Sequence, residues 1–406
     1  MFKFNKSQNT AFNTRLANIS TFAIASAMLF TVPAAAAEEE APSPTVAFTV
    51  DYTLDFVGAV SGGLAKKVRH LDNLDIAADI NLDQGLGWKG GALHLEVSNT
   101  SGQTPSEDAG NLQGVDGNEV GAQRLRLYQA YFEQSFAGNR ANLRLGWSDV
   151  SGEFAVADAS GYLMNPSFGM APELAGSGPQ GAAAFPSTAL TARLSIKPSE
   201  NTYGLAAVVN ARVGTWGDPQ GVETSFDDGE LIIAEAGWTG RGKVAAGLWG
   251  YTKKIEDQRA VNAAGDPVKR RAQGVYAVVE QPLNEPAEGD RAATAFLRVG
   301  LSDGDTQALK SSVQAGVSID AVVKGRPDSN LSIGITQAHL AKSYRQNSAD
   351  AGLPLSSGET VFELSYSDQI NSRVRVQPDI QYIQRPSGDR TIKDAVVVGL
   401  RLNLAF

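Results

Sequence analysis

Two kinds of side chain that can bind hydroxyl groups recur along this sequence, at alternate positions of β-like segments and in one long loop. An arginine guanidinium presents a planar fork of hydrogen-bond donors, and a carboxylate accepts hydrogen bonds from adjacent hydroxyls. Placed opposite each other, such groups can hold a hydroxyl-rich solute briefly, without making or breaking a covalent bond. The candidates are Glu96, Arg126, Arg144, Glu153, Asp158, Glu173, Arg193 and Glu235.

Covalent catalysis has little support in the residue types. The chain has no cysteine, which excludes thiolate chemistry and Cys-ligated zinc, and its only histidines are His70, His94 and His339. A hydrolase would need one of them beside a nucleophile. His94 shares a strand face with Glu96, but the sequence places no serine next to it. We therefore expect no enzyme, no metal and no cofactor.

The C-terminal segment indicates which elements position these groups. From Val396 to Phe406, every second residue is apolar, and Arg401 and Asn403 lie between them. A period of two with one apolar and one polar face is typical of a half-buried strand. A closed barrel in lipid requires such strands, because one face meets hydrocarbon and the other meets water.

Sixteen segments show this alternation or are rich in β-forming residues, and an even number is typical of bacterial single-chain barrels. We therefore expect an all-β protein, a 16-stranded antiparallel transmembrane β-barrel. The segments are 50–61, 71–83, 91–99, 124–136, 139–148, 187–197, 202–212, 229–239, 242–252, 272–281, 292–302, 310–323, 329–340, 358–369, 372–383 and 392–406.

The joins between the segments alternate in length, which a β-sandwich or a solenoid has no reason to do. Short turns on one rim and long loops on the other are typical of outer-membrane barrels, where they face the periplasm and the exterior. Only 282–291, on the short-turn side, fits poorly. The short joins are 137–139, 198–201, 240–241 and 371, and the long ones are 100–123, 149–186, 213–228, 253–271 and 341–357.

The alternation also assigns the faces of the strands. In 190–197 the apolar residues point outward, and Thr191, Arg193, Ser195 and Lys197 point inward; 74–83 and 373–382 divide in the same way. The pattern predicts a polar inner wall with charges of both signs around a water-filled lumen. Arg126 and Glu133 have opposite parity, so both can face inward only if a β-bulge lies between them.

The N-terminus predicts export. Basic residues, an apolar stretch from Thr21 to Val32 and four alanines before Glu38 are typical of a signal peptide, here 1–37. We expect 38–49 to be a short periplasmic lead-in and 50–406 to be the barrel. Removing 1–37 leaves 32 of the 35 Lys and Arg against 44 Asp and Glu, a net charge of −12, which argues against nucleic acid as a partner.

A set of short motifs resembles one known family. The stretch Arg126–Gln134, RLYQAYFEQ, resembles a strand of the carbohydrate-selective porin family, called OprB-like. Two positions depart from the family pattern, namely Gln129, where relatives often have Glu, and Trp147, where a polar or basic residue is common. Further similar blocks follow in the same order at 143–149, 165–169, 177–179, 185–186, 233–237 and 377–383.

This resemblance implies a sixteen-stranded barrel in the outer membrane of a Gram-negative bacterium that admits mono- or oligosaccharides by diffusion. It also implies that the third long loop, 149–186, folds inward and narrows the pore. Outer-membrane lipid would surround the barrel, and both a monomer and a homo-oligomer stay open. A general porin, or one for another small solute without sugar preference, is the alternative; an adhesin-like barrel would instead have a plugged lumen.

Overall fold

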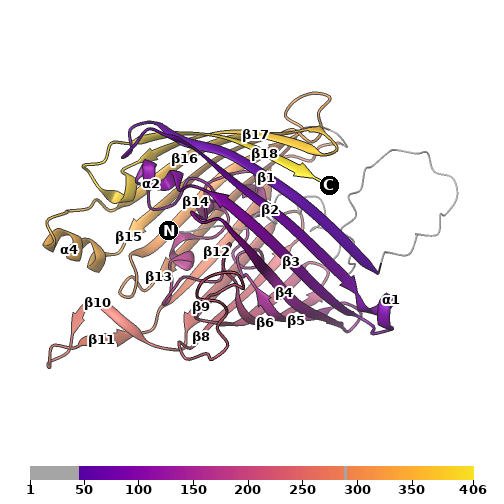
Figure 1. Ribbon diagram of the computed structural model, residues 1–406, viewed down its shortest axis with the longest axis horizontal. Helices are drawn as coiled ribbons and strands as arrows, with labels where there is room; N and C mark the ends of the chain where they lie inside the picture. Colours follow the sequence, from indigo (N-terminus) through magenta and orange to yellow (C-terminus); the bar gives the residue numbers. More distant parts are fainter. Residues whose placement is uncertain (1–44, 288–289) are drawn as a thin grey trace.

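The computed structural model describes residues 45–287 and 290–406, in which sixteen strands close into one antiparallel barrel (Figure 1). The first strand, β1 (Val46–Ser61), pairs with the last, β18 (Ala395–Ala405), so that the sheet has no free edge. The predicted fold class is confirmed. The other barrel strands are β2 (Val68–Asn81), β3 (Gly91–Gly102), β4 (Arg124–Phe136), β5 (Ala141–Ser148), β6 (Ala189–Ser199), β7 (Thr202–Asn210), β8 (Glu230–Thr239), β9 (Lys243–Tyr251), β12 (Gln273–Pro282), β13 (Ala292–Ser302), β14 (Leu309–Asp320), β15 (Asn330–Leu340), β16 (Gly358–Asn371) and β17 (Val374–Gln384).

Each of the sixteen predicted segments overlaps one barrel strand. The first strand begins at Val46, earlier than the predicted start at residue 50. The predicted signal peptide, 1–37, and the following residues up to 44 lie outside the described residues.

The helices of the described residues are short and lie in the connections between strands. Among the described residues, no helix is long and apolar enough to cross a membrane. The helices are α1 (Leu82–Leu86), α2 (Pro105–Ala109), α3 (Pro172–Ala175) and α4 (Lys342–Asp350), with 3-10 turns at Asp158–Ser160, Pro166–Phe168 and Pro386–Gly388.

A separate hairpin of β10 (Ile255–Val261) and β11 (Pro267–Arg270) occupies the loop predicted at 253–271, and it projects from the end of the barrel that carries the long loops (Figure 1). Asp257 accepts hydrogen bonds from the backbone N–H groups of Ala260 and Arg259 and from Arg270, and these contacts lower the pKa of the Asp257 carboxyl. The hairpin therefore has a polar base of its own.

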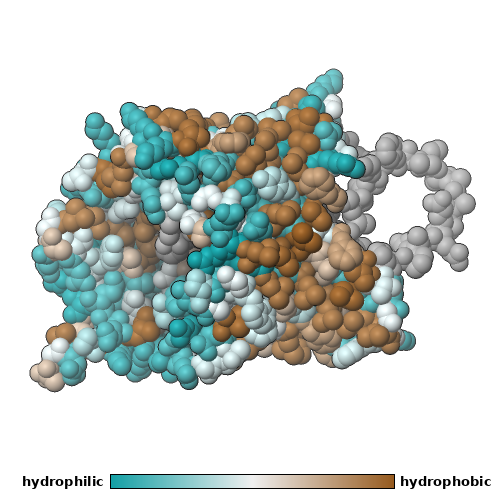
Figure 2. Space-filling model, in the orientation of Figure 1, coloured by the Kyte–Doolittle hydropathy of each residue, from teal (hydrophilic) through white to brown (hydrophobic). Residues whose placement is uncertain are grey.

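The outer surface carries an apolar band. Outward-facing apolar side chains such as Phe48, Leu194 and Ile380 are exposed. A large apolar surface of this kind is unfavourable in water. In Figure 2 the brown apolar side chains gather over the half of this face that lies toward the short turns, and the long-loop end is mostly teal. This distribution is that of a barrel surrounded by lipid.

A β-bulge in β4 sets which of its side chains face inward. Glu96 of β3 pairs with Gln129, but the next residue, Val97, pairs with Leu127, so Tyr128 is the extra residue. Arg126 and Tyr128 are both buried on the inside, and Glu133 reaches inward to Arg144. The bulge that the parity of Arg126 and Glu133 required is therefore present.

Candidate functional site

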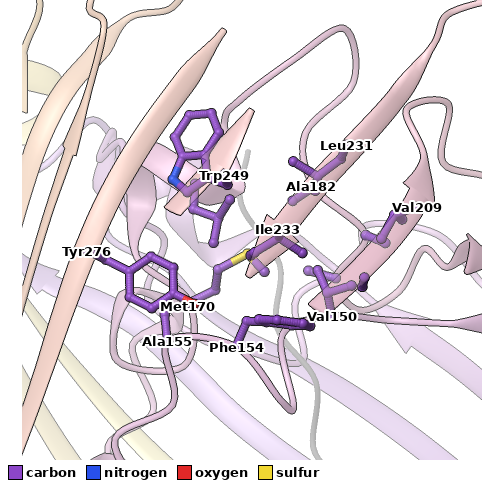
Figure 3. Packing of buried hydrophobic residues seen from close by; sticks show 14 of the residues in the cluster. Val150, Phe154, Ala155, Met170, Ala182, Val209, Leu231, Ile233, Trp249 and Tyr276 are labelled. Atoms are coloured by element: carbon purple, nitrogen blue, oxygen red, sulfur yellow. The ribbon is translucent and has the colours of Figure 1, made fainter. Parts of the chain in front are cut away.

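The loop between β5 and β6, residues 149–188, lies inside the barrel and packs against one side of its inner wall. Phe154 and Met170 of this loop belong to one buried cluster with Leu231 and Ile233 of β8 and Trp249 of β9 (Figure 3). Here the inner wall differs from the polar wall that the alternation predicted. The reason is that the loop, and not water, covers these strands, so apolar inward residues are stabilised by burial.

A buried arginine fixes the loop from the wall. Arg298 of β13 has no exposed surface and donates hydrogen bonds to the backbone oxygens of Ala155 and Gly169, both at 2.9 Å, and of Ser167. Its Nε also donates to Oε1 of Gln314 at 2.9 Å. The wall thus provides hydrogen-bond donors for loop carbonyls that have no partner in a helix or strand. Buried backbone groups need such partners.

Buried carboxylates of the wall fix the same loop through its backbone N–H groups. Glu235 of β8 accepts from Ala155 N at 2.8 Å and from the hydroxyls of two wall tyrosines. Glu280 of β12 accepts from Ala159 N at 2.7 Å, and Glu363 of β16 accepts from the N–H groups of Met164 and Asn165. The loop is therefore hydrogen-bonded to wall strands from β8 to β16, and it lies inside the barrel.

Two arginines and two glutamates meet where the loop faces the wall of β4–β6. Arg144 Nε donates to Glu133 Oε1 at 2.7 Å, and its Nη1 lies 2.8 Å from Glu153 Oε1. Arg193 Nη2 donates to the same two oxygens, at 2.9 and 3.0 Å. We call Glu133, Arg144, Glu153 and Arg193 the quartet; its formal charges balance, and the side chain of Glu153 is 20% exposed.

A second group of charges lies next to the quartet on β2, β3 and β4. His94 Nδ1 is 2.7 Å from Asp79 Oδ1, and its Nε2 is 3.6 Å from Glu96 Oε2. Gln129 donates to Glu96 at 2.8 Å. Glu96 therefore has partners on both sides and is itself almost fully buried.

The remaining loop acid at the lumen surface is Asp158, whose side chain is 42% exposed. It lies 3.6 Å from Lys243 Nζ of β9, and Lys243 also donates to Val156 O at 2.7 Å. The loop therefore presents two partly exposed acids, Glu153 and Asp158, each next to a basic residue of the wall.

Glu173 and Arg126, which the sequence predicts as site residues, lie away from the quartet. Glu173 of α3 is fully buried and accepts a hydrogen bond from Ser312 Oγ of β14. Arg126 donates to Thr100 at 2.8 Å and to Asp218 at 2.9 Å, which ties β4 to the loop between β7 and β8. The structure thus brings Arg144, Glu153 and Arg193 together, and it places Glu173, Arg126 and Glu235 as anchors of loops.

The burial of Glu173 yields a prediction. We expect Glu173→Gln to leave the ion selectivity of the channel unchanged, since no exposed atom of this side chain faces the lumen. Glu153→Gln should shift the reversal potential in a salt gradient toward anions, because it removes an exposed negative charge at the narrowed part. Equal shifts for both variants would contradict this placement.

Three residues of the site did not stand out in the sequence. Glu133 has the opposite parity to Arg126, so its inward position depends on the bulge in β4. Lys243 and Arg298 stand at inward positions of their strands, which alternation alone could have assigned. Within residues 45–287 and 290–406, no group of three or more acidic or histidine side chains could hold a metal ion.

Comparison with known proteins agrees with this architecture. The chain is 22% identical to Porin B of Pseudomonas aeruginosa, over 88% of this chain and 87% of that protein. It is 26% identical to the putative porin QuiX of Acinetobacter baylyi, over 26% of this chain and 28% of that protein.

Solved structures agree in fold. A high-pH structure of Pseudomonas putida OprB superposes with a TM-score of 0.79 at 20% identity, over 89% of this chain and 94% of that one. The channel DcaP of Acinetobacter baumannii gives a TM-score of 0.55 at 11% identity, over 89% and 97%.

The family profile described as "Carbohydrate-selective porin, OprB family" matches residues 65–406, which include every strand of the barrel except β1. This match spans most of the chain, and the closed sixteen-stranded barrel agrees with it. The chain therefore belongs to the carbohydrate-selective porin family, the OprB family, and is a sugar-selective porin of the Gram-negative outer membrane.

Proposed function

We propose that sugars cross this porin by exchanging hydrogen bonds with the quartet of Glu133, Arg144, Glu153 and Arg193. The observation that supports this most is the meeting of loop and wall there, with guanidinium forks and carboxylates at bonding distance of one another. A sugar carries adjacent hydroxyls that both donate and accept. It can therefore replace part of each Arg–Glu contact while it passes.

The balance of charge within the quartet supports an uncharged solute. A net positive constriction would retain anions, and a net negative one would retain cations. Two arginines against two glutamates give neither preference, but they offer many donors and acceptors in a small space. Because every group of the quartet already has a partner, the net gain on binding a sugar is small, so the sugar can leave again.

The orientation of the barrel follows from its two ends. We propose that the end with the long loops faces the exterior and that the short turns face the periplasm, as is usual for such barrels. Residues 1–37 would direct export and be removed. Since the narrowed region consists of a hydrogen-bonded loop in a channel, we propose a passive pore and no enzymatic activity.

The decisive experiment is single-channel recording with added sugar. We expect glucose or a disaccharide to block the ion current of the wild-type channel in a saturable way. Arg144→Gln and Arg193→Gln should each weaken this block about tenfold, because each removes charge-assisted hydrogen bonds from the constriction. Lys197→Gln is the matched control, since it removes another inward cation of β6 that lies outside the quartet.

The alternative function gives a different result. A general porin without sugar preference would pass sugars according to size alone, and the current would fall in proportion to concentration with no saturation. Wild-type recordings of that kind, or equal effects of the quartet variants and Lys197→Gln, would reject the quartet as the sugar site.

A further inference from the structure

One tyrosine beside the quartet is enclosed on both faces of its ring. The guanidinium carbon of Arg144 lies 4.0 Å from the ring centroid of Tyr131, on β4. The ring of His94, on β3, stacks on Tyr131 with a centroid distance of 4.7 Å and an interplanar angle of 17°. Asp79 of β2 holds His94 through Nδ1 at 2.7 Å. Four side chains from four neighbouring strands therefore form one column.

The backbone provides room for this column. Tyr131 stands directly opposite Gly146 of β5 in the register of the sheet. A Cβ on Gly146 would lie 2.6 Å from Tyr131 Cα and 2.8 Å from its Cβ, and the φ of Gly146 is +143°, which disfavours other residues. Since no side chain occupies the position opposite, the Tyr131 ring is free to lie along the wall toward Arg144.

The column determines how Arg144 presents its donors. The Tyr131 ring packs against this guanidinium, whose Nε donates to Glu133 and whose Nη1 lies 2.8 Å from Glu153. Arg193 is oriented differently, by a hydrogen bond of 2.6 Å from Nη1 to Asn142 Oδ1. An aromatic face attracts a guanidinium and also limits its rotation.

We propose that Tyr131, supported by His94 and Asp79, is a positioning residue that fixes the guanidinium of Arg144 for sugar binding. Because His94 and Arg144 cover its two faces, Tyr131 offers no free face on which a sugar ring could stack. It therefore acts through Arg144 and not by contact with the solute. This inference rests on the proposed function, in which the quartet binds the sugar.

The test measures the dissociation rate of a blocking sugar and the open-channel conductance separately. Tyr131→Leu removes the ring and should raise the dissociation rate of glucose or a disaccharide about fivefold, because Arg144 loses its cation–π support. Tyr131→Phe keeps the ring and should restore a rate within about twofold of the wild type. Phe132→Leu is the matched control on the same strand, since Phe132 packs against Trp88 and not against the column.

A second variant covers the case in which Tyr131→Leu does not assemble. His94→Leu leaves Tyr131 in place but removes its support and the link to Asp79, and it should raise the sugar dissociation rate more than Phe132→Leu does. The inference would be overturned if neither Tyr131→Leu nor His94→Leu changed the sugar dissociation rate. It would also be overturned if Tyr131→Phe raised this rate as much as Tyr131→Leu does. If Arg144→Gln also has no effect on the block by sugar, the proposed sugar site is wrong. If Arg144→Gln weakens the block but the Tyr131 and His94 variants do not, only the positioning role is rejected.

Discussion

Arg298→Met is expected to raise the single-channel conductance about twofold or more and to abolish saturable block by sugar, because the pore-narrowing loop loses its central anchor. Arg298 is fully buried and donates to three backbone carbonyls of that loop, those of Ala155, Ser167 and Gly169. Hydrogen bonds from a charged donor contribute about 1.5–3 kcal/mol each, and the carbonyls left behind would be buried without partners. Methionine fills similar space but donates nothing.

The control for this variant is Arg373→Met. Arg373 is an exposed arginine in the turn between β16 and β17 and is not one of the residues that hold the loop. Its replacement should leave conductance and sugar block unchanged. The strand pairing of β13 does not depend on the Arg298 side chain, so the barrel should still form and migrate as a folded species in unheated gel samples. Wild-type conductance with wild-type block in Arg298→Met would show that Arg298 does not hold the loop.

Asp55→Ala is expected to have the largest effect on stability, a loss of about 3 kcal/mol or more in the free energy of unfolding. Asp55 of β1 and Arg401 of β18 are direct cross-strand partners at the closure of the barrel. The guanidinium of Arg401 donates to both oxygens of Asp55, at 2.8 and 2.9 Å, and Asp55 has no exposed surface. Removal of one partner from a buried pair leaves a charge that is only partly compensated.

The loop between β3 and β4 should loosen in the same variant, since Asn118 of that loop donates to Asp55 at 2.6 Å. Denaturant unfolding in lipid vesicles measures the change. The matched control is Asp228→Ala, which removes the partner of Lys253 (3.2 Å) in an exposed pair and should cost less than about 1 kcal/mol. Equal losses for Asp55→Ala and Asp228→Ala would contradict a special role of the closure.

The strands and their faces could be predicted from the sequence. Alternation places Arg193 inward and Leu194 outward on β6, and the structure has Arg193 almost fully buried and Leu194 45% exposed. The reason is that a strand in lipid has a local requirement: each outward residue meets hydrocarbon, whatever the rest of the chain does. The same holds for the loop lengths, which follow from the spacing of the strands.

The site could be predicted only in part. The sequence predicts Arg144, Glu153 and Arg193 as inward or loop charges, and in the structure Glu153 lies 2.8 Å from Arg144 and 3.0 Å from Arg193. The position of Glu133 is hard to predict from the sequence because a bulge at Tyr128 reverses the parity of β4, and this bulge is set by pairing with β3. Glu173 and Arg126 have the residue types of a sugar site, but the structure uses them to hold loops: Glu173 accepts from Ser312, and Arg126 donates to Asp218.

The sequence by itself therefore determined the barrel, its lipid-facing and inward-facing residues, and the set of charges available inside. Only the tertiary structure decided which of these charges stay at the lumen surface and which hold the loop. The physical reason is that a loop of irregular backbone inside a barrel must find partners for its own N–H and C=O groups, and Glu235, Glu363 and Arg298 supply them. Those partners come from strands distant in sequence, so no local pattern records the choice.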